Sequence, residues 1–258
     1  MRSSIPPYET KVPIKVRIQG QDSVYTFVKS IVYHLVQSAS KASSSSSMEW
    51  VVKVRDVEPE NRCLLLHPLS TSLPLEPNSE SFPDELNVLE FQVSELARCY
   101  SLRKSNSNEA EHKVVVSSDP HWHALMVMAE AKLYYGWDFS TASVEIQECT
   151  LVRDILFEHH KFEDVIFHKS KFYVVAKNGT TVSIDSSLKM TQVAYPTTCS
   201  RSKKLVESLG DLLLVEKRAR PLRRRCPHNP THHGCKVYKL NEPERQWVEM
   251  KSLTLLAK

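Results

Sequence analysis

A strand pattern that recurs after 39 and then 40 residues restricts the fold of this sequence more than any other feature. Its anchors are Leu133, Phe172 and Leu212, which occupy the same place in the runs KLYY, KFYV and DLLL. An apolar run precedes each anchor strand, in ALMVMAE, EDVIFHK and KKLVES. A run with alternating character follows each one, in VEIQE, TVSID and CKVYKL, as expected of half-buried strands. The chain therefore contains at least three copies of one strand-rich unit.

The third copy adds a further strand, QWVEMKS, after a polar turn that begins at Asn241. A sheet of four short antiparallel strands cannot cover its own apolar faces, so it must stack on neighbouring sheets. The repeat thus predicts an all-β fold, a β-propeller-like arrangement of kelch-like blades. The alternative is a plain β-sandwich, whose strands also follow one another after short turns.

Local signals place individual elements along the chain. Apolar runs on both sides of Asn178-Gly179 predict a hairpin, and both residues tolerate the positive φ of a two-residue type I′ turn. Residues 49–70 predict a second hairpin with its loop at 56–61, whereas residues 86–102 fit either a strand or a short helix. The serine-rich run at 38–47 predicts a flexible loop.

Composition favours a globular intracellular protein. The chain has 258 residues, of which 41% are hydrophobic, enough to bury a core. No run approaches the roughly 20 apolar residues that span a bilayer, so we expect no membrane partner. The 6 cysteines are scattered, which favours a reducing compartment, and we expect the protein in the nucleus, the cytoplasm or both.

Positive charge is concentrated in the run KRARPLRRR at 217–225. Without its six basic side chains, 28 lysines and arginines face 30 acidic residues. The run predicts a nuclear-localisation or anion-binding segment, because guanidinium groups bind anions with paired hydrogen bonds. The alternative function is a nuclear nucleic-acid-binding protein, but no helix or aromatic platform presents these charges, so nucleic acid is the weaker hypothesis. The basic side chains are Lys217, Arg218, Arg220, Arg223, Arg224 and Arg225.

The run CPHNPTHHGC contains a set of side chains that could surround zinc: Cys226, His228, His232 and Cys235. Two thiolates and two imidazoles form a common tetrahedral ligand set. Their spacing matches no standard zinc finger, however, and an insertion between two strands explains the run more simply. We therefore expect no metal and no cofactor.

Histidines elsewhere raise the question of catalysis. Asp119, His121 and His123 are close in sequence, but the run DPHWH reads as a turn that enters a strand. His159, His160 and His168 are expected on loop and strand surfaces. The sequence has only 5 glycines and no phosphate-binding loop, nucleophile elbow or H-E-x-x-H motif. It therefore predicts a protein that binds rather than an enzyme; a metal-dependent hydrolase that uses the histidine-rich segments is the rival hypothesis.

Six segments together resemble one family: RCLLLHPLS, LNVLEFQVSEL, KVVVSSDP, FEDVIFHKSKFYVV, KLVESLGDLLLVEKR and CKVYKLNEPERQWVEMKSL. In order and spacing they are similar to the KIB-type β-propeller of plant F-box proteins, from about residue 12 to residue 253. The resemblance implies a non-catalytic protein-recognition module, because in that family the propeller selects substrates for an SCF-type cullin ubiquitin ligase. It does not identify the protein substrate.

The resemblance also implies a division of the chain. MRSSIPP resembles the last residues of an F-box, so residues 1–11 would be an F-box remnant and linker. Residues 12–258 would be the propeller domain, with the loop at 38–47 and a basic, histidine-rich insertion at 217–235. Family members usually continue after the segment that matches WVEMKSL, so the resemblance implies that the propeller here is incomplete or open. We therefore expect a truncated receptor that binds the ligase adaptor only if a full F-box is encoded upstream.

Overall fold

The structure is a computed structural model that describes residues 15–37, 49–57, 62–66, 91–104, 112–119, 124–137, 147–196, 202–217 and 235–250. The regular elements in these ranges are all β-strands, which confirms the predicted all-β class. No helix there is long and apolar enough to cross a membrane. The chain divides into two compact units, the first made of Met1–Val114 with Thr141–Glu148 and the second of Val115–Ser140 with Cys149–Lys258.

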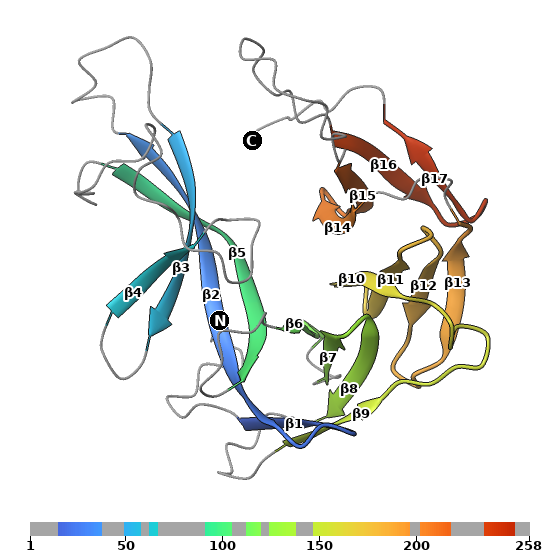
Figure 1. The fold of residues 1–258 in the computed structure, drawn as a ribbon. Helices are drawn as coiled ribbons and strands as arrows, with labels where there is room; N and C mark the ends of the chain where they lie inside the picture. The colour runs from blue at the N-terminus through green and yellow to red at the C-terminus, as the bar shows by residue number, and fades with distance from the viewer. Residues whose placement is uncertain are drawn as a thin grey trace, which may run out of the picture. The chain divides into compact units, whose positions relative to one another are not determined.

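The first unit is organised around one long strand, β2, which pairs antiparallel with β1, β3 and β5 (Figure 1). Strand β4 extends the sheet beyond β3, and β6 pairs with β5. Both β2 and β5 have 14 residues, so this unit does not show the short strands of the repeat. Its strands are β1 (Lys15–Ile18), β2 (Val24–Gln37), β3 (Glu49–Val57), β4 (Arg62–Leu66), β5 (Phe91–Lys104) and the first part of β6 (His112–Val116).

Three of the sequence predictions fall on this unit. The hairpin in 49–70 is confirmed as β3 and β4. The ambiguous segment 86–102 is a strand over its described part, because β5 pairs with β2 along its whole length. The serine-rich run at 38–47 lies outside the described residues, as does the proposed F-box remnant at 1–11. The division of the chain at residue 11 therefore stays a prediction.

The second unit contains three groups of antiparallel strands that follow one another along the chain, and we call them the first, second and third blades. The second and third blades are separate four-stranded sheets. Their anchor strands are β8, β11 and β15, which contain Leu133, Phe172 and Leu212 as the repeat predicts. Of the run VEIQE, at 144–148, the structure describes Gln147 and Glu148, and both lie in β9. The first blade contains β7 (Ala124–Ala129), β8 (Lys132–Trp137) and β9 (Gln147–Leu151). The second contains β10 (Phe162–His168), β11 (Lys171–Ala176), β12 (Thr181–Ile184) and β13 (Met190–Ala194). The third contains β14 (Ser202–Ser208), β15 (Asp211–Lys217), β16 (Cys235–Asn241) and β17 (Gln246–Glu249).

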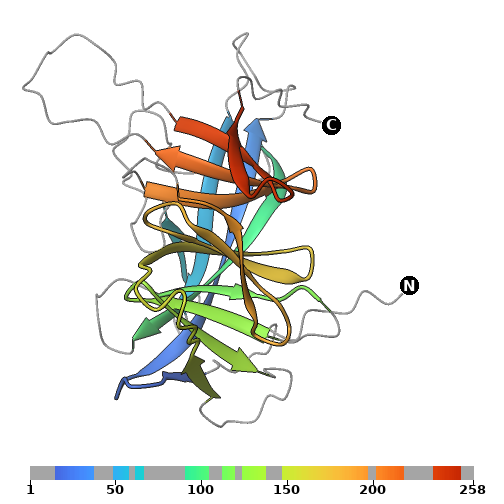
Figure 2. The ribbon, with the colours of Figure 1, turned by 90° about the vertical axis from the view of Figure 1, so that its right-hand side faces the viewer.

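The second blade is buried on both faces because its side chains alternate between two hydrophobic clusters. On β11, Phe172 and Val174 join a cluster with residues of the first blade, such as Met126. Their neighbours Tyr173 and Val175 join a second cluster with β14 and β15 of the third blade. Figures 1 and 2 show β10–β13 between the other two blades. A plain sandwich has only two layers, so this stack of three blades favours the predicted propeller over the sandwich.

Hydrogen bonds connect the third blade to the second. The Trp247 indole Nε1 donates a hydrogen bond to Thr181 Oγ1 at 3.1 Å. The backbone N–H of Tyr195 donates to the carbonyl of Arg245 at 3.0 Å. At the inner strands, the backbone N–H of Leu205 donates to Asp164 Oδ2 at 2.8 Å. These bonds satisfy polar groups that the stacking removes from water, which would otherwise destabilise the contact.

The predicted hairpin of the second blade is confirmed as β11 and β12, but its predicted turn type is wrong. Only Gly179 has a positive φ, 92°, whereas a type I′ turn needs two such residues. The Gly179 N–H donates to the Ala176 carbonyl at 2.8 Å. This is the arrangement of a type I turn followed by one left-handed glycine in a bulge, a loop that also matches the strand twist.

Pairs of residues with the left-handed backbone conformation occur instead in the turns that precede the anchor strands, one pair in each blade. Each pair has two positive φ angles in succession, as a type I′ turn requires. The spacing of the pairs follows the 39- and 40-residue repeat of the anchors. The pairs are Glu130 and Ala131, Lys169 and Ser170, and Leu209 and Gly210.

Candidate functional site

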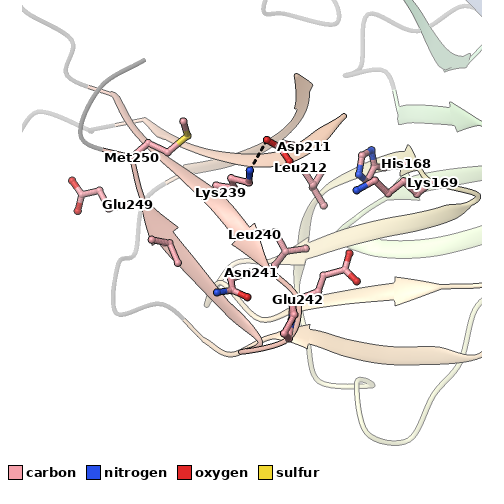
Figure 3. Close-up of a pocket in the computed structure, with 12 residues that line it drawn as sticks. His168, Lys169, Asp211, Leu212, Lys239, Leu240, Asn241, Glu242, Glu249 and Met250 are labelled. Carbon is pink, nitrogen blue, oxygen red and sulfur yellow. Dashed lines mark hydrogen bonds and ion pairs between the residues drawn. The ribbon is translucent and has the colours of Figure 1, made fainter. Parts of the chain in front are cut away.

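A pocket of about 520 Å³ opens on the third blade, close to the end of β10 in the second (Figure 3). Strands β15, β16 and β17 supply most of its lining, and the turn after β16 closes one side. Apolar side chains in the lining are Leu212, Leu240, Pro243, Val248 and Met250. Charged and polar side chains in the lining are His168, Lys169, Asp211, Lys239, Asn241, Glu242 and Glu249.

Several charged side chains of the pocket already have partners within the chain. Lys239 Nζ lies 2.6 Å from Asp211 Oδ2, and both side chains are about half exposed. Glu242 Oε1 accepts a hydrogen bond from the Tyr173 hydroxyl at 2.8 Å. Burial, reinforced by this carboxylate, raises the pKa of Tyr173 well above its usual range. The pocket can therefore hold a mixed apolar and polar group by contact, with paired charges at its edge.

His168 corrects one of the sequence predictions. We expected it on a strand surface, yet its side chain is only 3% exposed. It is the last residue of β10, and its Nδ1 lies 3.0 Å from Glu207 Oε2 of β14. Its ring packs at a tilt against Tyr173, with ring centroids 5.7 Å apart. Stacking of the second blade on the third covers this end of β10, and a single-strand pattern could not reveal that contact.

The other histidines follow the prediction more closely. His159 is exposed in the turn before β10, and the ring of the neighbouring His160 packs against Phe157 with centroids 5.5 Å apart. Asp119 lies in a short loop where its backbone N–H donates to Ser117 Oγ at 3.1 Å. Residues 120–123 lie outside the described residues, so the expected turn in DPHWH stays a prediction, and the apolar run after it forms β7.

Of the candidate zinc and anion-binding residues, the structure describes two. Lys217 ends β15 and Cys235 begins β16, and the two residues are paired across the sheet. The other candidates, Arg218 to Arg225 and Cys226 to His232, lie outside the described residues. Among the side chains that the structure does describe, no group of three or more histidine, cysteine, aspartate or glutamate residues could hold a metal ion. The expected absence of zinc and the proposed nuclear-localisation role of the basic run are therefore untested and remain predictions.

Sequence reasoning missed an exposed apolar pair in the turn between β9 and β10. Ile155 is 90% exposed and Leu156 is 79% exposed, and they precede the buried Phe157. The Asp154 side chain accepts a hydrogen bond from the Leu156 N–H at 2.9 Å. An aspartate that bonds its own backbone two residues on is a common turn signal, so Asp154 could have located this turn.

Comparison with known proteins decides the family. The sequence matches the model of the KIB1-4 beta-propeller over residues 21–256. The chain belongs to this family. Its KIB1-4 beta-propeller is 30% identical over 197 residues to the F-box protein SKIP23 of Arabidopsis thaliana, an alignment that covers 70% of the chain. It is 26% identical over 232 residues to the probable F-box protein At1g65740 and 28% identical over 229 residues to the F-box protein At2g17036, both of the same plant. No solved structure matches.

The match confirms the resemblance to the KIB-type propeller of plant F-box proteins. It also confirms the β-propeller fold class that the 40-residue repeat predicts. The chain spans 45%, 58% and 54% of the lengths of the three relatives named above.

Proposed function

We propose that this chain is a non-catalytic protein-recognition module, the substrate-selecting part of an SCF-type ubiquitin ligase receptor. The observation that carries the proposal is its membership of the KIB1-4 beta-propeller family together with relatives that are named F-box proteins. The stack of three blades supports it, because rigid sheets can position variable loops against a partner. The proposed partner is a protein substrate, and the role needs no cofactor.

A chimeric receptor tests this proposal directly. The F-box part of the F-box protein SKIP23 is joined to the amino terminus of this chain, and the fusion is assembled with the ligase adaptor and cullin. Proteins cross-linked to the chain in plant cells are then offered as substrates, and their ubiquitination is measured. We expect at least one cross-linked protein to be modified by the fusion and spared when the chain is omitted. Absence of such a protein, while the intact relative is active in the same assay, would contradict the proposal.

Adaptor binding is proposed to depend on the F-box and not on the propeller. The chain as written should therefore fail to bring down the adaptor in a binding assay with purified proteins, while the fusion should bind it. Stoichiometric binding of the adaptor by the chain alone would show that the propeller itself contacts the ligase.

The basic run at 217–225 is proposed as a nuclear-import segment rather than a nucleic-acid site. Replacing its six basic residues with serine should shift a fluorescent fusion from the nucleus to the cytoplasm. In a gel-shift assay the same replacement should cause little change. Tight, salt-sensitive DNA or RNA binding that disappears with the replacement would favour the nucleic-acid alternative, because phosphate contacts release counterions.

A further inference from the structure

The turn between β9 and β10 presents two large apolar side chains to solvent in a fixed conformation. Ile155 and Leu156 are 90% and 79% exposed, more than most other large apolar residues that the structure describes. The residues on either side fix the turn. The Asp154 carboxylate and carbonyl accept hydrogen bonds from the N–H groups of Leu156, at 2.9 Å, and Phe157, at 3.0 Å.

Phe157 anchors this turn to the body of the second unit. Its side chain is 7% exposed and belongs to the hydrophobic cluster between the first and second blades. The His160 N–H donates to the Phe157 carbonyl at 3.0 Å, which closes the next part of the turn. An apolar pair on such a support loses little conformational entropy when a partner covers it, and this favours tight binding.

Neighbouring loops add positive charge around this turn. The Lys161 carbonyl accepts a hydrogen bond from the Lys177 N–H at 2.8 Å, so the turn before β10 and the loop after β11 are adjacent. The side chains of Arg153, Lys161 and Lys177 are exposed. On the acidic side, Glu158 is exposed and the Asp154 carboxylate is engaged within the turn.

The basic run begins at the same end of the blades. Lys177 O accepts a hydrogen bond from Lys203 Nζ at 3.1 Å. Lys203 is next to Ser202, and Ser202 pairs with Lys217, the first residue of the run. The first residue of the basic run, Lys217, is therefore in the part of the third blade that lies next to the loop after β11.

We propose that Ile155 and Leu156 are the apolar centre of a surface that binds an acidic, extended protein segment with adjacent large apolar side chains. This inference rests on the proposed function, and it names the class of substrate segment that the module would select. Apolar contacts would supply most of the affinity, and the flanking cations would favour an acidic sequence and accelerate its association.

An anionic membrane is the other surface that exposed apolar residues beside cations can bind. The protein segment is favoured here because, among the described residues of this turn, two large apolar side chains project, too few for the broad apolar face of a membrane-bound element. Vesicle binding is therefore an outcome that the experiment must be able to register.

The experiment selects random peptides displayed on phage against the purified chain and against the Ile155→Ser, Leu156→Ser double variant. Peptides enriched only on the unmodified chain are synthesised, and their binding is measured by fluorescence anisotropy. We expect them to be acidic with adjacent apolar residues, and we expect the double variant to bind them about tenfold more weakly, as loss of a binding hot spot would cause. Affinity should also fall as salt is raised, because salt screens exposed charges.

Leu209→Asn provides a matched control. Leu209 is 87% exposed and also lies in a turn of the second unit, between β14 and β15. That turn lies at the opposite end of β14 from Ser202, because Ser208 pairs with Asp211 whereas Ser202 pairs with Lys217. Asparagine accepts the left-handed conformation of this position, so the variant should fold and bind the peptides as the unmodified chain does.

Three results would overturn the inference: no enriched peptide, equal binding by the double variant, or binding of phosphatidylserine vesicles through these two residues without any peptide preference. Failure of this surface can be distinguished from failure of the proposed function. If the fusion receptor carrying Ile155→Ser and Leu156→Ser still modifies its partner, the receptor role stands and the surface is wrong. If peptides bind at the turn but the fusion modifies no protein, the surface stands and the receptor role is wrong.

Discussion

Lys203 and Glu216 face each other on β14 and β15, and both side chains are fully buried. Their charged atoms are 3.7 Å apart. The Lys203 ammonium also donates to the Lys177 carbonyl at 3.1 Å, and the Tyr238 hydroxyl donates to Glu216 at 3.4 Å. Lysine and glutamate are almost never buried without a partner, so a sequence pattern assigns both to the surface. Only the stacking of the blades explains their burial.

Removal of one charge from this buried pair should be strongly destabilising. We expect Glu216→Gln to lower the free energy of unfolding by about 3–5 kcal/mol, because it leaves the lysine charge buried without its counterion. The double variant Lys203→Met, Glu216→Leu should recover most of that loss, since apolar residues of similar size can replace a buried pair. Urea unfolding of the three chains measures both effects.

Asp211→Asn is the matched control for the buried pair. It breaks the exposed ion pair with Lys239 in the same blade, and exposed pairs contribute less than about 1 kcal/mol. A loss for Asp211→Asn as large as that for Glu216→Gln would mean that burial does not govern these interactions.

Tyr173 should make stability depend on pH in the alkaline range. Burial and the Glu242 carboxylate raise its pKa in the folded chain, so folding favours the protonated phenol. This contribution is complete below the pKa of an unfolded tyrosine, about 10, and is lost as pH rises through the higher folded-state pKa. Tyr173→Phe should remove that part of the alkaline decline in urea unfolding. Tyr195→Phe, at an exposed site, is the control. If Tyr173→Phe loses stability with rising pH as steeply as this control does, Tyr173 does not cause the alkaline decline.

At the scale of elements, the strands could be predicted better than the turns. The anchors Leu133, Phe172 and Leu212 reveal β8, β11 and β15 because apolar periodicity records burial directly. The two-residue turns before them could not be identified, since Glu-Ala and Lys-Ser lack the Asn-Gly signal. Conversely, Asn178-Gly179 carries that signal but forms a different turn. Turn type depends on how the whole hairpin twists, which a dipeptide does not specify.

These turns provide a paired test of backbone strain. Ser170 has φ 58°, a conformation that glycine adopts without cost, so Ser170→Gly should stabilise the chain by about 1 kcal/mol. Gly210 occupies the corresponding second position with φ 78°, and a Cβ added there would meet no atom within 4 Å. Gly210→Ala should therefore destabilise by about 1 kcal/mol through the backbone alone. Thermal unfolding of both variants checks the pair, and changes of the same sign would contradict the turn assignment.

At the scale of the whole molecule, the sequence predicts the fold class but not the functional surface. The repeat identifies three stacked sheets because each one needs neighbours on its faces. The candidate sites predicted from single runs, the basic segment and the cysteine and histidine cluster, lie mostly outside the described residues. The pocket and the exposed pair Ile155 and Leu156 arise from residues that come together only when the blades stack or a turn closes. Local sequence carries little signal for such contacts.

Paired substitutions on adjacent residues of β11 test the stacked arrangement most directly. Val174 and Val175 point to opposite faces, and both are fully buried. Val174→Thr and Val175→Thr should each lower the free energy of unfolding by about 1–3 kcal/mol, because each places a hydroxyl in an apolar cluster. The same change at Val248, which is 47% exposed, should have little effect. If urea unfolding shows that one of the two β11 variants is as stable as the unmodified chain, one face of the blade is open to water and the propeller-like stack is contradicted.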